Sequence, residues 1–171
     1  MKLHRFRTSI FFVMVSITSF LFLCINVFAA DERCQYCGME RADYGHSWVI
    51  IEHEDGTECG LCSVHCAAID MALHTDKPVK KITVGDYNTK KQIDAEKAYW
   101  IIGGDLPGVM TARAKWAFES RAEADSFMSK YGGKPANFDA VMKASFDDMY
   151  ADTLMIQKKK QQMKMKKDKK S

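Results

Sequence analysis

The pattern of apolar and polar positions in the first half of the chain predicts a β-hairpin followed by a helix. Residues 47–53 are β-branched and aromatic, a Glu-Asp-Gly turn signal follows, and residues 57–61 form the second expected strand. Residues 63–74 carry apolar side chains at helical spacing, with Ser63 as candidate N-cap and Pro78 as the stop signal. The second strand therefore ends where the helix begins.

Strands followed by a helix recur further along the chain. Short strands are expected over residues 79–84 and 91–93, and buried strands over residues 98–102 and 115–118. The stretch between the last two is too irregular to assign. A Ser-Arg-Ala-Glu capping box at Ser120 then opens a helix, which a Gly-Gly pair closes. This repeated order predicts two related lobes.

Apolar side chains beyond residue 137 keep a helical period, so a C-terminal helix is expected over residues 137–157. Residues 158–171 hold eight Lys and one Asp, a run of like charge that predicts a Lys- and Met-rich disordered tail. The chain has 171 residues, of which 47% are apolar, enough for two small lobes sharing a core. The expected fold class is α+β, in which each lobe is a β-hairpin plus a helix with added strands.

Charge and targeting signals indicate an exported protein. Three basic residues precede an apolar run over residues 10–28, and a small-x-small pattern ends at Ala29. Residues 1–29 are therefore expected to be a signal peptide, with a retained membrane anchor or lipid attachment at Cys24 as alternatives. Each alternative places the body in the periplasm or elsewhere outside the cytoplasm.

The net charge changes sign along the exported chain. The body, residues 30–157, has 14 Lys and Arg against 21 Asp and Glu, a balance of −7, whereas the tail carries +7. An acidic body outside the cytoplasm is not expected to bind nucleic acid. The basic tail favours contact with anionic lipid or a partner.

Candidate chemistry concentrates in 33 residues that hold five of the six cysteines. Cys34 and Cys37 form a Cys-x-x-Cys turn, which places two sulfurs on one side of a tight loop. Cys62 and Cys66 are four residues apart at the expected helix start, where backbone N–H groups favour thiolate over thiol. If the hairpin brings these segments together, they form either a soft-metal site, for Cu(I) or Zn(II), or a disulfide cluster.

Three further residues in the same motifs widen the choice of ligands. Cys59 completes a second Cys-x-x-Cys, a spacing that is typical of structural zinc, although a strand position can also simply be buried. Met39 adds a thioether, which favours copper. His65 adds an imidazole, but on a helix it would point away from Cys62 and Cys66. Export favours disulfides, yet five cysteines leave one odd thiol.

A set of motifs resembles the NosL family, accessory proteins for nitrous-oxide reductase, over about residues 34–138. The motifs are Cys-x-x-Cys-Gly-Met near the mature start, Cys-Ser-x-x-Cys after the hairpin, Trp100 to Gly104, Ala117-Phe-Glu-Ser, Ala124 with Phe127, and Gly132-Gly133. The front half is also similar to the small YHS and TRASH metal-binding modules.

The resemblance implies an extracytoplasmic Cu(I)-binding chaperone, with two lobes over residues 30–136, that helps supply the copper sites of nitrous-oxide reductase. Cys37, Gly38 and Met39 match the family's Cys-Gly-Met, and Cys62 and Cys66 match the second cysteine pair of members that have one. The expected partner is a copper-accepting protein, either the reductase or one of its assembly factors.

We therefore expect a non-enzymatic metal-binding protein, because the sequence has no nucleophile elbow, paired acid motif or phosphate-binding loop. The candidate ligands are Cys34, Cys37, Met39, Cys62, Cys66, Cys59 and His65. Two alternatives stay open. A thiol-disulfide oxidoreductase would use Cys34 and Cys37, although the parallel βαβ context of that motif is absent. A structural zinc module would use the cluster for protein interaction.

Overall fold

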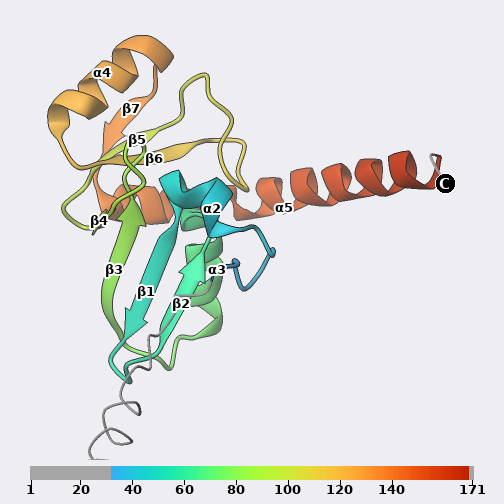
Figure 1. Cartoon of the computed structure of the whole chain (residues 1–171), viewed down its shortest axis with the longest axis horizontal. Coiled ribbons are helices and arrows are strands. Elements are labelled where there is room, and N and C mark those ends of the chain that lie inside the picture. The colour runs from blue at the N-terminus through green and yellow to red at the C-terminus, as the bar shows by residue number, and fades with distance from the viewer. Residues whose placement is uncertain (1–31, 170–171) are drawn as a thin grey trace, which may run out of the picture.

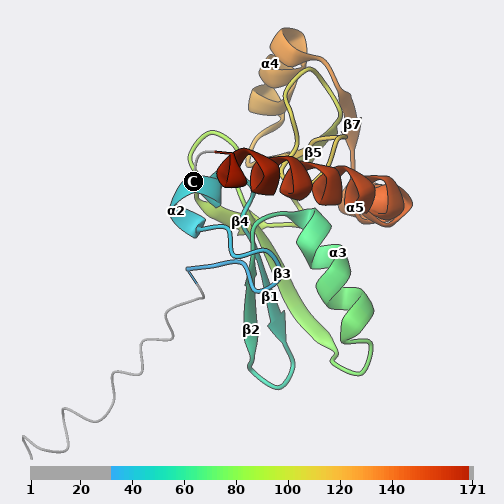
Figure 2. The ribbon, with the colours of Figure 1, turned by 90° about the vertical axis from the view of Figure 1, so that its right-hand side faces the viewer.

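The computed structural model describes residues 32–169, which form two antiparallel sheets and a long C-terminal helix (Figures 1 and 2). That helix contacts both halves of the molecule, through the helix of the first lobe and a central strand of the second. The segment expected as signal peptide or anchor, residues 1–29, lies outside the described residues.

The first lobe is a four-stranded sheet in the order β2-β1-β3-β4. Its elements are β1 (Val49–His53), β2 (Glu58–Leu61), α3 (Val64–Leu73), β3 (Val79–Gly85) and β4 (Gln92–Asp94). The expected hairpin is confirmed, with Ile51 opposite Cys59, and α3 packs against both of its strands. Alternate residues of β1 are buried, as expected of a strand with one face toward a core.

The second lobe is a three-stranded sheet in the order β6-β5-β7, which confirms the predicted repeat of strands and helix. Its elements are β5 (Tyr99–Ile102), β6 (Lys115–Phe118), α4 (Arg121–Tyr131) and β7 (Lys134–Ala136). The sequence did not indicate β7, because Pro135 cannot donate to a ladder. An edge strand tolerates this loss, and β7 lies at the edge.

The loop between β3 and β4 joins the two lobes. The backbone N–H of Tyr87 donates to the Ala117 carbonyl at 2.8 Å, and its ring packs against Phe127. Asp86 is fully buried and accepts a hydrogen bond from the Glu119 backbone N–H at 2.9 Å. These contacts fix the first sheet against β6.

The C-terminal helix α5 (Phe138–Asp168) corrects one expectation. It begins where predicted, with the Asn137 side chain accepting a hydrogen bond from the Ala140 N–H at 2.9 Å. It does not end at residue 157, so residues 158–168 are helical rather than disordered. Lys, Gln and Met all favour helix, and neither Gly nor Pro interrupts the segment.

The capping box at the start of α4 supports a stability prediction. Ser120 Oγ accepts a hydrogen bond from the Glu123 N–H at 3.3 Å and donates to Glu123 Oε2 at 2.8 Å. Ser120→Ala should lower the free energy of unfolding by about 1 kcal/mol, because a helix N–H loses its partner. Chemical denaturation of the reduced protein measures the change.

A second serine of α4 provides the control. Ser129 is exposed, and its hydroxyl donates only to the Asp125 carbonyl within the same helix. Ser129→Ala should change the free energy of unfolding by less than about 0.5 kcal/mol. Equal losses in the two variants would argue against the cap.

Candidate metal centre

A closed turn positions the first two cysteines. The Gly38 N–H donates to the Cys34 carbonyl, and the Cys34 N–H donates to the Met39 carbonyl, each at 2.8 Å. The turn requires the left-handed backbone at Gly38, whose φ is +73°, a conformation that glycine adopts without steric cost. Arg33 and Glu40 close its base through a β-bridge and a 2.6 Å ion pair. Both sulfurs are thereby held by a short, braced loop.

The second pair of cysteines lies where β2 meets α3. Cys62 follows the strand directly, and its carbonyl accepts a hydrogen bond from Ser47 Oγ at 2.8 Å. Cys66 lies in the first turn of α3. Ser63 occupies the N-cap position but makes no side-chain cap bond; its hydroxyl instead lies 3.8 Å from the Cys62 sulfur. This junction presents two sulfurs toward the Cys34 turn.

The four sulfurs of Cys34, Cys37, Cys62 and Cys66, here called the four-sulfur group, all lie within 4.8 Å of one another. The Cys37 and Cys62 sulfurs are 3.4 Å apart, and those of Cys62 and Cys66 are 3.6 Å apart. A disulfide would need about 2.05 Å. A tetrahedron with metal–sulfur bonds of about 2.3 Å has edges of about 3.8 Å. The spacing therefore suits four thiolates around one metal ion.

Burial leaves the four-sulfur group open at one residue. Cys34 is 2% exposed, and Cys62 and Cys66 are fully buried, whereas Cys37 is only partly buried. A buried metal site exchanges its ion most readily through its least covered ligand. Among residues 32–169, no other set of three His, Cys, Asp or Glu side chains brings its ligand atoms this close.

Hydrogen bonds within the four-sulfur group determine where negative charge resides. Cys34 accepts hydrogen bonds from the other three thiols, which hold its pKa far below the usual range. The bonds that Cys62 and Cys66 make to Cys34 and Cys37, together with burial, raise the pKa of both thiols, so they stay protonated. The bond to Cys34 raises the pKa of Cys37, but the other two thiols lower it further, to about 7. At neutral pH the group thus carries one thiolate and part of a second.

Cys59, the strand cysteine among the candidate ligands, lies outside the four-sulfur group. It is buried, and its sulfur donates to Gln35 Oε1 at 2.9 Å and lies 3.5 Å from Asp70 Oδ1. Asp70 also accepts a hydrogen bond from the Tyr36 hydroxyl at 2.6 Å. Sequence reasoning missed this network, although an Asp within an apolar helix was its visible signal. The network ties α3 to the segment that carries Cys34.

His65 is also kept apart from the four-sulfur group. Its Nδ1 lies 3.4 Å from Asp152 Oδ2 of α5, and both side chains are buried. Adjacent residues of a helix point about 100° apart, so His65 and Cys66 face different neighbours. Burial lowers the pKa of His65, which keeps the imidazole largely neutral. The residue joins α3 to α5 and has no place among the four sulfurs.

Met39, the thioether candidate, has a half-buried side chain that lines a cavity beside the Cys34 turn. Its carbonyl holds the turn closed, as described above. The structure thus places this sulfur beside the four-sulfur group in the chain, on a wall that other side chains share.

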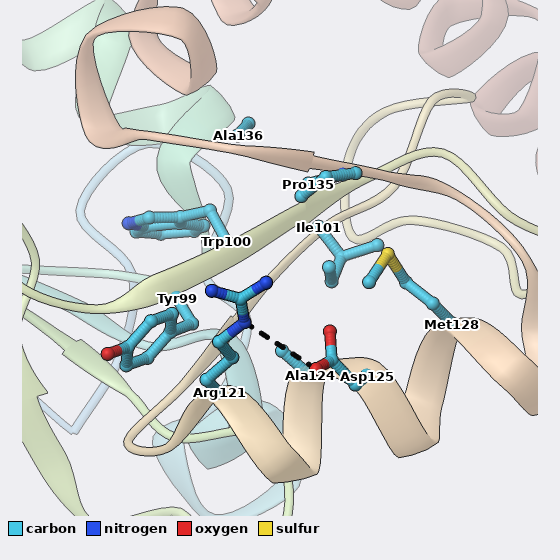
Figure 3. A pocket seen from close by; sticks show the side chains of 9 residues that line it. All are labelled: Tyr99, Trp100, Ile101, Arg121, Ala124, Asp125, Met128, Pro135 and Ala136. Atoms are coloured by element: carbon cyan, nitrogen blue, oxygen red, sulfur yellow. Dashed lines mark ion pairs between the residues drawn. The ribbon is translucent and has the colours of Figure 1, made fainter.

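A second cavity, of about 410 Å³, lies on the second lobe between β5, β7 and α4 (Figure 3). Arg121 Nε lies 3.6 Å from Asp125 Oδ2 there, and Met128 supplies the only sulfur among the nine lining residues. One sulfur does not make a soft-metal site, so copper chemistry concentrates in the first lobe.

Comparison with known proteins gives two matches. A family model described as NosL matches residues 26–146. Among solved structures, the chain is similar to the copper chaperone NosL from Shewanella denitrificans, with a TM-score of 0.55 and 21% sequence identity over 67% of this chain and 92% of that chain. At this identity the likeness shows a shared fold. A search of curated proteins finds no match.

Proposed function

The chain belongs to the NosL family, and from that premise we propose that it is a non-enzymatic Cu(I) metallochaperone that works outside the cytoplasm. The four-sulfur group holds the ion, and the protein passes it to a copper-accepting partner, nitrous-oxide reductase or one of its assembly factors. The observation that carries the proposal is the convergence of four cysteine sulfurs to within 4.8 Å of one another.

Two features favour copper over zinc as the cargo. Thiolate sulfur suits both ions, but a thioether such as that of Met39, two residues after Cys37, is a soft ligand that suits Cu(I). The structural neighbour from Shewanella denitrificans is itself described as a copper chaperone.

Transfer proceeds by ligand exchange at Cys37, the least buried of the four cysteines. A sulfur or imidazole of the partner binds copper as the Cys37 thiolate leaves, so that one bond to copper forms while another breaks. Copper stays Cu(I) throughout, and no oxidant or reductant is required.

The proposed location rests on the N-terminal sequence. Within residues 32–169, no helix has both the length and the apolar character needed to cross a membrane. We infer that residues 1–29 export the chain or anchor it, and that the basic end of α5 adds contact with anionic lipid.

Metal analysis of tag-free protein, purified under reducing conditions from its native cell envelope, tests the proposal. We expect about one copper per chain and little zinc, because the four-sulfur group selects a soft ion. A variant with Cys62→Ser and Cys66→Ser, purified in the same way, should lose that copper. Stoichiometric zinc without copper would contradict the proposal.

Structural zinc binding is the second candidate, since the near-tetrahedral spacing of the four thiols suits zinc as well. The same metal analysis separates it from copper. A thiol-disulfide oxidoreductase is less well supported, because each strand pairing in residues 32–169 is antiparallel and Cys34 is 2% exposed.

A further inference from the structure

A second cluster of sulfur lies in a cavity of about 420 Å³ between the two lobes and α5. Four thioethers line it, from Met39, Met110, Met155 and Met163. Met39 follows Cys37 by two residues, so one wall of the cavity continues directly from the four-sulfur group. Figure 2 shows the distal part of α5 passing beside α2 (Arg41–Tyr44), which supplies Tyr44 to the same cavity.

Hydrogen bonds hold α5 against the loop that carries the second of these methionines. Arg113 donates to both carboxylate oxygens of Asp148, at 2.7 and 2.9 Å. The Ala112 backbone N–H donates to Asp152 Oδ1 at 2.9 Å, and Asp152 is 2% exposed. Met155 comes three residues after Asp152, so this anchor positions the start of the thioether row on α5.

The methionines of the cavity are poorly explained as core filler. Met163 is 62% exposed, and its side chain therefore stabilises little by burial. Met110 has φ +60°, a left-handed conformation that costs a non-glycine residue about 1 kcal/mol or more. Side chains kept under exposure or backbone strain are characteristic of functional sites. Thioether sulfur without thiolate is selective for Cu(I) among biological metal ions.

Two lysines in the same wall set the strength and charge selectivity of such a site. Lys159 and Lys160 line the cavity with the methionines. Their repulsion doubles with the charge of a cation, so it opposes Zn(II) more than Cu(I). It also keeps Cu(I) affinity below that of the four-sulfur group, which suits an ion in transit.

We propose that the C-terminal helix completes a second, weaker Cu(I) site, in which Met155 and Met163 join Met39 and Met110. Copper passes through this site on its way between the four-sulfur group and a partner, an inference that rests on the proposed function. The family match ends at residue 146, so the two α5 thioethers belong to a part of the chain beyond it. Each transfer replaces one sulfur ligand by another, with no change of oxidation state.

The test follows methionine methyl signals by NMR as Ag(I), a redox-stable ion of the same charge and softness as Cu(I), is added to the full reduced chain. The first equivalent should fill the four-sulfur group. Further Ag(I) should then shift the methyl signals of Met155 and Met163 and leave that of Met165 in place. Met165 lies on the same helix and does not line the cavity.

A matched pair of variants measures the affinity. The double variant Met155→Leu with Met163→Leu keeps the apolar volume and should weaken the second equivalent by about tenfold or more. Met165→Leu should leave both equivalents unchanged. Equal second affinities in the two variants, or α5 methyl signals that stay fixed up to saturation, would overturn the methionine site alone. Shifting α5 signals without a tight first equivalent would instead contradict the four-sulfur function and retain the methionine site.

Discussion

Replacing Cys62 and Cys66 together by serine is expected to lower the affinity for Cu(I) by at least about a hundredfold, since loss of outer-shell groups alone costs metal sites about 10- to 100-fold. Both sulfurs are fully buried in the four-sulfur group, at 3.6 Å from each other. Serine keeps the size and hydrogen bonding of cysteine, but its hydroxyl is a hard ligand that stays protonated. The change therefore removes two thiolates without opening a cavity. Anaerobic titration of Cu(I) against a competing chelator measures the affinity.

The control for this prediction is Cys59→Ser. Its sulfur donates to Gln35 Oε1 and lies outside the four-sulfur group, and a serine hydroxyl can make the same bond. We expect its Cu(I) affinity to match that of the unmodified protein. Unchanged affinity in the Cys62 and Cys66 double variant would show that copper binds elsewhere.

Acid is expected to release copper steeply. The raised pKa values of Cys62 and Cys66 mean that binding by all four thiolates must expel both of their protons, at any pH up to and beyond neutral. Cys34, with its strongly lowered pKa, contributes no proton. Above pH 7, each unit of acidification should thus lower the Cu(I) affinity by about 100-fold.

Below pH 7 the dependence becomes steeper, because Cys37, with a pKa of about 7, is then protonated in the metal-free protein as well. A third proton competes with copper, and the affinity should fall by about 1,000-fold per unit. Competition titrations at several pH values, with the chelator's own protonation corrected, measure the slope. Proton release of about two per copper at pH 8 provides an independent check. An affinity that does not change with pH would contradict binding by these buried thiols.

Local patterns in the sequence predicted most of the fold. The hairpin, α3 and the α4 capping box each depend on residues within one short segment, and all three are present. The extent of α5 was not predictable in the same way. Repulsion between the lysines beyond residue 157 favours an extended chain, whereas their helix propensity and the anchored first half of α5 favour a helix.

The four-sulfur group shows the limit of spacing as evidence. The zinc-like spacing pairs Cys59 with Cys62, but a strand turns successive side chains to opposite faces, and Cys62 lies beyond the strand's end. Cys59 therefore meets Asp70 on α3, while Cys62 and the next helical turn face the Cys34 loop. Only the path of the chain from β2 into α3 selects Cys66 in place of Cys59.

Contacts between distant segments could not be predicted from the sequence. His65 and Asp152 lie 87 positions apart and meet because α5 packs on α3. Met39 and Met163 share a cavity for the same reason. Neither pairing leaves a local signal, since each partner taken alone fits an ordinary helix or turn.

X-ray absorption at the copper edge, on reduced protein loaded with one equivalent of Cu(I), tests the central claim most directly. We predict a first shell of sulfur alone, with thiolate character, that is lost in the Cys62→Ser and Cys66→Ser double variant. A shell containing imidazole nitrogen, or a sulfur shell that is unchanged in the double variant, would contradict copper binding by the four-sulfur group.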